Sequence, residues 1–425
     1  MRFSSLGLVE PLLRAIEDNA YNTPSPVQVQ AIPAILQGRD VLVAAQTGTG
    51  KTASFVLPLL QCLSKGGKAG SNQARALILV PTRELAQQVA DSVVRYGCYL
   101  PLRSAVVFGG VKINPQMMRL RKGVDVLVAT PGRLLDLYHQ NAIHFDQLES
   151  LVLDEADRML DLGFMREVQK ILALLPKKRQ NLLFSATLSE SIRTLSQDWL
   201  NDALQVDVTP RKVAAKMVRQ AVYEVDKAKK PALLSHLVRD NDWNQVLVFT
   251  RTKRGADRLV QKLVKDGVSS VAIHGDKSQG ARTRALSEFK SGVIRVLVAT
   301  DIVARGIDII ELACVINLDL PKVAEDYVHR IGRSGRAGCE GLALSLVSAD
   351  EVDLLAAIEN RIGQTLVREL ETGFVPTHNV PLTILKPGAN KPKKPKKPKK
   401  HKVPRAKNKA ANNQSRQRRS TRGKP

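Results

Sequence analysis

The stretch SLVLDEADRMLD, residues 150–161, joins an apolar run directly to a cluster of negative charge. Ser150 to Leu153 have the character of a strand end, and Asp154, Glu155 and Asp157 then place three carboxylates in four positions. Carboxylates are favoured at a helix N-terminus, so one explanation is a helix start. The other is a metal and water site at the carboxyl end of the strand. Either explanation predicts a strand followed by a helix, and the rest of the chain must decide between them.

Short apolar runs of the same kind recur along the chain. They are DVLVAA (40–45), ALILV (76–80), SAVVF (104–108), DVLVAT (125–130), LLFSAT (182–187), QVLVFT (245–250), SVAIH (270–274), RVLVAT (295–300), CVINLD (314–319) and LALSLV (342–347). Continuous rather than alternating apolarity is typical of parallel strands covered on both faces. Helical patterns separate the runs, for example at 83–97 and 252–267. The sequence therefore predicts an α/β fold with parallel sheets, which bind ligands beyond the carboxyl ends of their strands.

The chain divides into two related halves. VLVAT occurs at 126–130 and again at 296–300, each copy at the end of a predicted strand, although a coincidence among strand-forming residues would give the same pentapeptide. We predict an N-terminal domain at 1–205, a linker at 206–217, a C-terminal domain at 218–370, and an extension with a tail at 371–425.

Charge is concentrated at the C-terminal end of the chain. The 425 residues have a formal net charge of +25, and residues 386–425 hold 17 of the 65 Lys and Arg with no acidic residue. The expected partner is a polyanion, and nucleic acid is the first candidate. A nuclear localisation signal or a contact with a membrane surface is the alternative. The repetitive segment KPKKPKKPKK (391–400) cannot bury a core and is expected to be disordered when free.

Several classes of protein are not indicated. The four cysteines are far apart and form no CxxC pair, which argues against a zinc site or a disulfide framework and fits a reducing compartment. The N-terminus lacks the pattern of a signal peptide, and no run approaches the ~18 apolar residues of a membrane span.

AQTGTGKT (45–52) follows a predicted strand and precedes an apolar helical run. Glycines there let backbone N–H groups turn toward phosphate, Lys51 would reach the β and γ phosphates, and the Thr52 hydroxyl would bind Mg²⁺. The usual pattern has Gly where this chain has Ala45, and a glycine-rich turn without a ligand is the alternative. A phosphate loop needs a carboxylate at the end of a second strand to hold the metal, and the stretch at 150–161 supplies one. Asp154 would then lie at the metal, and Glu155 would act on the attacking water.

Further motifs follow in order along the chain. They are YNTPSPVQ (21–28), PTRELA (81–86), Gly109-Gly110, TPGR (130–133), DEAD (154–157), SAT (185–187), LVFTR (247–251), QGAR (279–282), ATDIVARGID (299–308) and HRIGRSGR (329–336). On these residues the chain resembles a DEAD-box RNA helicase from about residue 3 to residue 347, and within that family it is most similar to the bacterial RhlE-like subgroup. The resemblance implies two tandem RecA-like domains, ATP and Mg²⁺ as cofactors, and RNA as partner.

The resemblance also implies roles for individual residues. The residues expected to bind nucleotide are Phe3, Tyr21, Gln28, Ala45, Gln46, Thr47, Gly48, Thr49, Gly50, Lys51, Thr52, Gly306 and Asp308. The catalytic set is Lys51, Asp154, Glu155, Arg333 and Arg336, with Thr52 and Asp154 at the metal. The residues expected to bind the RNA backbone are Pro81, Thr82, Arg83, Gly109, Gly110, Thr130, Pro131, Gly132, Arg133, Arg251, Gln279, Arg282 and Thr300. Asp157, Ser185, Thr187 and His329 would couple the two halves.

Three arginines in the last motif also suggest phosphate binding from residue type alone. Arg330, Arg333 and Arg336 are three apart, so on a helix they would share one face, and guanidinium groups suit phosphate oxygens. A solvated basic helix is the alternative. The resemblance singles out Arg333 and Arg336 as arginine fingers, which would leave the site incomplete until the second domain closes.

The function expected first is an RNA-stimulated ATPase that unwinds short duplexes or remodels RNA–protein complexes. An ATP-gated RNA clamp or annealing chaperone, a DNA-directed translocase, and an RNA-binding protein without nucleotide turnover are the alternatives. We also expect a cytoplasmic protein with a monomeric core that works on ribosomal precursor particles or in RNA-decay complexes.

Overall fold

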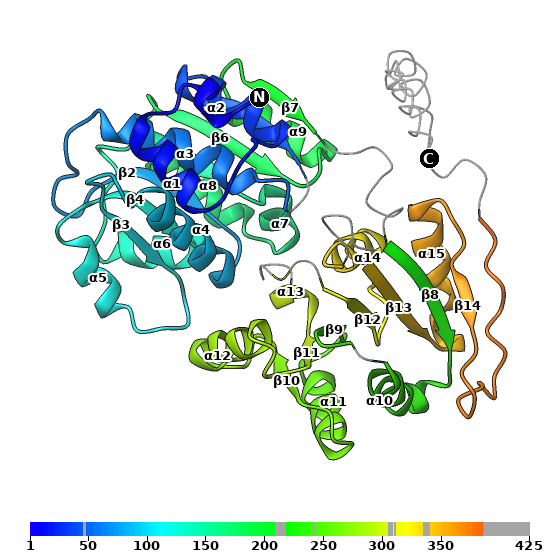
Figure 1. The fold of residues 1–425 in the computed structure, drawn as a ribbon. Helices are drawn as coiled ribbons and strands as arrows, with labels where there is room; N and C mark the ends of the chain where they lie inside the picture. The colour runs from blue at the N-terminus through cyan, green and yellow to red at the C-terminus, as the bar shows by residue number, and fades with distance from the viewer. Residues whose placement is uncertain are drawn as a thin grey trace, which may run out of the picture. The chain divides into compact units, whose positions relative to one another are not determined.

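The computed structural model describes residues 1–385, except 46–47, 209–217, 242, 305–308, 310–311 and 335–340. Within this described part the strands form two seven-stranded sheets, and their pairings are parallel. We call residues 1–208 the first lobe and residues 218–385 the second lobe; each contains one of the sheets with helices around it (Figure 1). The α/β fold predicted from the apolar runs is confirmed.

The sheet of the first lobe has the order β3-β4-β2-β5-β6-β1-β7. Its strands are β1 (Val41–Ala44), β2 (Ala74–Leu79), β3 (Ser104–Val107), β4 (Val124–Ala129), β5 (Ser150–Leu153), β6 (Gln180–Ser185) and β7 (Leu204–Asp207). The helical elements are η1 (Phe3–Leu6), α1 (Glu10–Asp18), α2 (Pro26–Leu36), α3 (Lys51–Ser64), α4 (Arg83–Tyr96), α5 (Asn114–Leu120), α6 (Pro131–His139), α7 (Ala156–Asp161), α8 (Met165–Leu174) and α9 (Glu190–Trp199).

The sheet of the second lobe has the order β10-β11-β9-β12-β13-β8-β14. Its strands are β8 (Val218–Glu224), β9 (Val246–Phe249), β10 (Ser270–Ile273), β11 (Val296–Ala299), β12 (Cys314–Asn317), β13 (Gly341–Val347) and β14 (Val367–Glu369). The helical elements are η2 (Lys227–Lys229), α10 (Lys230–Asp240), α11 (Lys253–Lys265), α12 (Gln279–Lys290), α13 (Asp301–Ala304), α14 (Ala324–Ile331), η3 (Ala349–Glu351) and α15 (Val352–Ile362).

The central strands are apolar on both faces because each face has its own core. In β9, Val246 and Val248 belong to one buried cluster, whereas Leu247 and Phe249 belong to another. Successive side chains of a strand point to opposite faces, so helices on both sides need an unbroken apolar run. The unbroken apolar runs in the sequence therefore indicated that both faces of each sheet are buried.

Three strands were not predicted, and two of them lie at sheet edges. β7 and β14 are short and half exposed, and β8 alternates buried with exposed residues at its start. The domain boundary predicted at residue 205 falls inside β7, which pairs with β1. The residues 209–217 of the predicted linker and the tail from residue 386 lie outside the described residues.

The residues after β14 pack onto the second lobe as far as Thr383. Val380 is 3% exposed and belongs to a buried cluster of this lobe. Thr377 donates to the carboxylate of Asp226, and Arg368 donates to the Val380 carbonyl and to the Thr383 hydroxyl. The packed part of the second lobe thus continues beyond the boundary predicted at residue 370.

Strand order brings the predicted site residues of the first lobe to one edge. β6 lies between β1 and β5, so the carboxyl ends of these three neighbours meet at the same side of the sheet. The phosphate-loop motif follows β1, the acidic stretch follows β5, and Ser185 ends β6. Within the described part of the chain, no helix has the length and apolar character needed to cross a membrane.

Candidate active site

The phosphate-loop motif forms the turn between β1 and α3. Gly48 and Gly50 have φ values of 76° and 88°, which glycine adopts without the strain that a side chain would add. A Cβ atom at Gly50 would lie 2.4 Å from Nε2 of Gln28, so the loop also needs glycine for close packing. Ala45 is buried at the end of β1, Thr49 is half-buried, and Gln46 and Thr47 lie outside the described residues.

Lys51 begins α3 and carries a buried ammonium group. Its Nζ has no hydrogen-bond partner among the described residues, although Asp154 and Glu155 interact with it electrostatically. A buried ammonium group without a hydrogen-bond partner favours the binding of an anion. The N-terminus of this 14-residue helix favours negative charge as well. The residues present therefore fit the phosphates of a nucleotide.

The acidic stretch is more than a helix start. Glu155 occupies the N-cap position of α7 but makes no capping hydrogen bond, and its φ of 54° is a left-handed conformation that is costly for a residue with a side chain. Asp154 accepts the Glu155 backbone N–H at 2.9 Å. Burial, and then the neighbouring Asp154, raises the pKa of Glu155 to about 7. A strained, half-buried carboxylate that caps nothing is better explained by chemistry than by helix stability.

The carboxylate of Asp154 suits a magnesium ion that is bound mainly by phosphate and water. It is buried at the end of β5, where burial raises its pKa and the charge of Lys51 opposes that shift. Thr52 is half-buried in the first turn of α3. Among the described residues no three His, Cys, Asp or Glu side chains gather as a metal site. Mg²⁺ is usually held by one or two carboxylates plus substrate phosphates, so this sparse set fits it.

The residues predicted to read adenine differ in how open they are. Tyr21 is 43% exposed, and its hydroxyl lies 3.4 Å from that of Tyr96, so its ring has an open face. Gln28 is buried; its Oε1 accepts the Ser25 N–H at 2.9 Å and its Nε2 donates to the Gly50 carbonyl at 3.2 Å. Phe3 lies in the apolar core of the first lobe rather than at an open surface.

Asp157 joins the acidic stretch to the end of β6. Its Oδ2 accepts hydrogen bonds from the Ala186 N–H, the Thr187 N–H and the Thr187 hydroxyl, each at 3.1 Å. Ser185 is buried and donates its hydroxyl to the Thr187 carbonyl at 2.8 Å. His329 of α14 is sensitive to Asp157: burial lowers the pKa of His329 and the charge of Asp157 opposes that shift. Hydrogen bonds thus connect Asp157, Ser185 and Thr187, and the coupling role of these residues and of His329 stays a prediction.

The prediction that three arginines share one helical face is wrong. Helix α14 ends at Ile331, so Arg333 lies beyond it, and Arg336 lies outside the described residues together with Gly306 and Asp308. The guanidinium of Arg330, 1% exposed, points into the second lobe, where it forms a bidentate pair with Asp301 at 2.6 and 2.7 Å. The charge of Arg333 acts on Glu155 and lowers its pKa against the effect of burial.

The predicted RNA residues of the first lobe lie after β2, β3 and β4. Pro81 is buried, and the Thr82 hydroxyl caps α4 by accepting the Leu85 N–H at 3.2 Å. The guanidinium of Arg83 lies against Gly110, where a Cβ atom would be 1.9 Å from Nη1. Gly110 leaves room for this guanidinium, and its φ of 76° also favours glycine at this position.

The TPGR motif forms the first turn of α6. Thr130 is its N-cap without a side-chain capping bond, Pro131 is buried and Gly132 is exposed. Arg133 donates from Nη2 to the Val111 carbonyl at 3.0 Å, while its buried Nε and Nη1 have no hydrogen-bond partner among the described residues. The carboxylate of Asp136 forms an ion pair with Nε at 3.6 Å, so Nη1 is the donor that suits an anionic ligand.

The predicted RNA residues of the second lobe are largely engaged by protein groups. Arg282 pairs with Glu84 at 2.6 Å between Nη2 and Oε2, and Gln279 donates to the other oxygen of Glu84 at 3.1 Å. Arg251 pairs with Glu351 at 2.9 Å. Thr300 is buried after β11.

Two residues of this region were missed from the sequence. Glu84 is 3% exposed and comes from α4 of the first lobe, so its pair with Arg282 joins the two lobes. Arg158 is buried behind the acidic stretch and donates to the Asp301 carbonyl at 3.5 Å. Both residues stand inside motifs that the sequence had already marked, but their partners are more than 140 positions away, and no local pattern identifies them.

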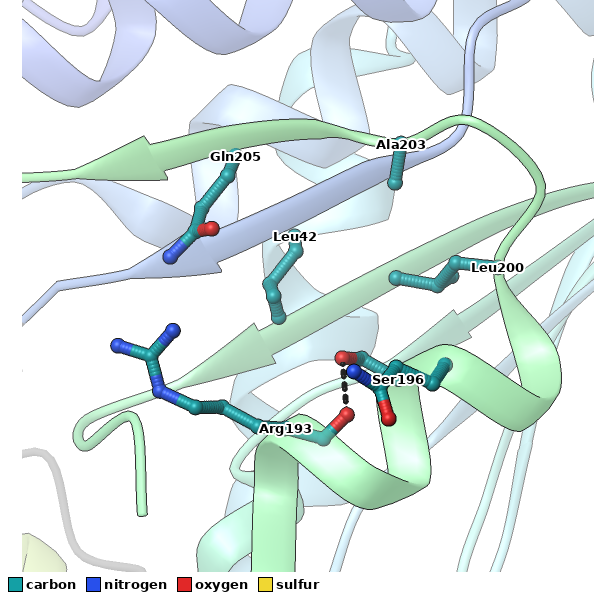
Figure 2. Close-up of a pocket in the computed structure, with 7 residues that line it drawn as sticks. Leu42, Arg193, Ser196, Leu200, Ala203 and Gln205 are labelled. Carbon is teal, nitrogen blue, oxygen red and sulfur yellow. Dashed lines mark hydrogen bonds between the residues drawn. The ribbon is translucent and has the colours of Figure 1, made fainter. Parts of the chain in front are cut away.

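A pocket of about 280 Å³ lies apart from these residues, between α9 and the β1–β7 edge of the first sheet. Figure 2 shows Leu42 and Gln205 on adjacent strands facing α9, where the Ser196 hydroxyl donates to the Arg193 carbonyl at 2.7 Å. None of the lining residues belongs to a predicted motif; Arg193, Gln197 and Gln205 are exposed, whereas Ser196 is buried.

Comparison with known proteins agrees with this geometry. Residues 25–195 match the family model of the DEAD/DEAH box helicase, and residues 229–338 match the helicase conserved C-terminal domain. The chain is 41% identical over 383 residues to the ATP-dependent RNA helicase RhlB of Pseudomonas syringae pv. tomato, covering 89% of this chain and 96% of that protein. This chain belongs to the DEAD-box ATP-dependent RNA helicases. It is also 42% identical over 365 residues to the helicase DeaD of Mycobacterium tuberculosis, covering 86% of this chain and 64% of DeaD.

A solved structure gives the same fold. The structure of Dbp5 from S. cerevisiae bound to RNA and ADP BeF3 superimposes with a TM-score of 0.76 at 31% identity, covering 87% of the helicase and 95% of Dbp5. The two tandem RecA-like domains predicted for the helicase are thereby confirmed. Its placement beside the RhlE-like subgroup stays a prediction.

Proposed function

We propose that this helicase is an RNA-stimulated ATPase that separates short RNA duplexes locally, or remodels RNA–protein complexes, by closing its two lobes on ATP and RNA. The observation that carries the proposal is the buried pair between Glu84 and Arg282, one from each lobe and each inside a motif expected at the RNA. A second connection, from Arg158 to Asp301, lies beside the acidic stretch. Contacts of this kind make the arrangement of the lobes and the state of the site depend on each other.

ATP would be held mainly by the first lobe. The loop at 45–52 and Lys51 would take the phosphates, while Tyr21 and Gln28 would recognise adenine. Thr52 and Asp154 would hold Mg²⁺, which when bound neutralises charge on the phosphate oxygens. Gly306 and Asp308 are proposed at the ribose, and Phe3 supports the adenine site from the core.

Glu155 is proposed as the base that orients and deprotonates the attacking water. Its half-buried carboxylate lies close enough to Lys51 and Arg333 for both charges to lower its pKa. Arg333 and Arg336 are proposed as arginine fingers, a device worth ~10³–10⁵ in rate. Because these arginines come from the second lobe, hydrolysis would require closure.

RNA would be bound by its backbone. Arg83, Gly110 and Arg133 offer donors and close backbone approach in the first lobe. In the second lobe Gln279, Arg282 and Thr300 are proposed at the RNA; Arg282 and Gln279 already bind Glu84, and Arg282 keeps a buried Nε without a hydrogen-bond partner among the described residues. Contacts with sugar and phosphate carry no base information, so binding without sequence preference is expected. The tail at 386–425 would add salt-dependent affinity as a tether, because each neutralised phosphate of a single strand contributes a slope of roughly −0.7 in log–log salt plots.

The proposal also covers the cellular location, the oligomeric state and the RNA targets of the protein. We propose a cytoplasmic protein with a monomeric core that acts on ribosomal precursor particles or in RNA-decay complexes. An ATP-gated RNA clamp or annealing chaperone is the second candidate, and it is favoured by the buried pair between Glu84 and Arg282, which would hold the lobes together on RNA.

Strand displacement and strand annealing, measured side by side on one short RNA duplex, test the proposal. We expect ATP-dependent displacement to exceed annealing, and ATPase stimulation by RNA to exceed stimulation by DNA of equal length. Annealing without displacement would favour the clamp, and equal stimulation by DNA would contradict the RNA-directed mechanism.

A further inference from the structure

Glu351 is a buried carboxylate, far along the chain from the nucleotide motifs, that is shared by two cations. It ends η3 and its side chain is 5% exposed. Its Oε2 pairs with Nζ of Lys230, which is equally buried, and its Oε1 accepts from Nη2 of Arg251 at 2.9 Å. Both oxygens are thus engaged by positive groups that come from two different elements, α10 and the segment after β9.

The charge balance of this cluster is uneven. Lys230 also donates to the Leu318 carbonyl at 3.0 Å, so a Lys–Glu pair alone would satisfy both buried charges. Arg251 adds a second cation, and the Asp319 carboxylate, which accepts the Arg251 backbone N–H, offsets part of the positive charge of Arg251. That charge lies at the surface, because the Arg251 side chain is 35% exposed whereas the other two side chains are buried.

Only one edge of the Arg251 guanidinium is held. Nη2 donates to Glu351 and, at 3.3 Å, to the Leu320 carbonyl, and the Arg251 backbone N–H donates to Asp319 at 2.8 Å. The remaining donors, Nε–H and Nη1–H, have no hydrogen-bond partner among the residues that the structure describes. A guanidinium fork that is fixed at one edge and open at the other is arranged to bind an anion such as phosphate.

The position of Arg251 agrees with such a ligand. Thr250 N–H donates to the Ala299 carbonyl, so the carboxyl ends of β9 and β11 lie side by side. Arg251 therefore stands at the same sheet edge as Thr300, another residue proposed at the RNA backbone.

We propose that Glu351 is a positioning residue for RNA binding: it holds the Nη2 edge of Arg251 so that the other donors face an RNA phosphate, while Lys230 anchors Glu351. This inference rests on the proposed function, because it needs Arg251 to contact RNA. Glu351 itself touches no nucleic acid; it acts by fixing the direction of a side chain that would otherwise rotate freely.

The test is an RNA titration of the ATPase activity of the full chain. Glu351→Gln keeps the shape but replaces the carboxylate with a neutral amide between two cations. We expect the RNA concentration for half-maximal stimulation to rise about tenfold, as for the loss of one charge-assisted hydrogen bond, with kcat at saturating RNA nearly unchanged. Arg251→Ala should give a rise of the same size, and the double variant should be no worse than Arg251→Ala alone.

Asp350 supplies a matched control in the same short helix. It pairs with Lys227 at 2.7 Å and accepts from Ser348, and among the described residues no hydrogen bond or ion pair joins it to Arg251. Asp350→Asn should leave the RNA dependence unchanged. Thermal unfolding of each variant separates a stability effect from an effect on RNA binding.

Arg251→Lys tests the same idea without disturbing the buried carboxylate. Lysine keeps the charge but cannot hold Glu351 and a phosphate at once with a planar fork, so an intermediate rise in the half-maximal RNA concentration is expected. Wild-type behaviour of this variant, additive effects in the double variant, or a Glu351→Gln protein that is only less stable would each overturn the inference. An unchanged Arg251→Ala would overturn it at its premise and would remove Arg251 from the proposed RNA contacts.

Discussion

Arg330 is expected to stabilise the second lobe rather than to bind phosphate. Four hydrogen bonds surround its guanidinium: two to Asp301, one to the Asn317 side chain and one to the Asp319 carbonyl. The guanidinium carbon also lies 4.8 Å from the centre of the Phe249 ring. Arg330→Met keeps the apolar stem and its contact with this ring but removes the charge.

The expected loss of stability follows from the burial of the two partners. Removing one member of a buried ion pair costs ~3–5 kcal/mol, because the other charge is left uncompensated. Asp301 is 26% exposed and can recover part of its hydration, so we expect the lower end, about 3 kcal/mol. With a urea dependence of ~2 kcal/mol/M, the unfolding midpoint should fall by roughly 1.5 M.

The chain offers a local probe for this measurement. It contains two tryptophans: Trp199 packs against a core of the first lobe and Trp243 against a core of the second. In a Trp199→Phe background, tryptophan fluorescence during urea unfolding therefore reports the second lobe. Arg333→Met is the control; we expect it to reduce ATPase activity strongly with little change in midpoint. An Arg330→Met protein with an unchanged midpoint and no ATPase activity would refute the reasoning.

Three further outcomes are expected. Glu155→Gln should keep ATP and RNA binding, measured by fluorescence anisotropy, but nearly abolish turnover; normal turnover would contradict its role as the base. Thr187→Ala removes one of the three hydrogen bonds on Oδ2 of Asp157, so strand displacement should fall more than RNA-stimulated ATPase activity, and an equal loss of both would argue against a coupling role. Deleting 386–425 should raise the RNA concentration for half-maximal binding and make RNA affinity less dependent on salt. An unchanged slope of affinity against salt would contradict the proposal that the tail is an RNA tether.

Much of the fold could be predicted because burial leaves a local pattern. The central strands were recognised from unbroken apolar runs, since both faces of each sheet are covered. The edge strands β7 and β14 escaped because an exposed edge needs no such run. Phe3 shows a similar limit: its resemblance to the family motif implied nucleotide binding, and only the packing of η1 shows that its side chain lies in the core.

The sequence by itself determined which motifs meet at the candidate site. The phosphate loop, the acidic stretch and the SAT motif each follow a strand, and parallel strands bring their carboxyl ends to one edge whatever their order. Only the tertiary structure decided which charged side chains face the candidate site and which stabilise the fold through buried ion pairs. Arg330 and Arg333 are three residues apart in one motif, yet the first points into the lobe toward Asp301 and the second acts on Glu155. Likewise, only the tertiary structure shows that Glu84 pairs with Arg282 and that Glu351 pairs with Arg251. The strength of a charge pair depends on distance and burial, and both are set by residues that lie far apart in the chain.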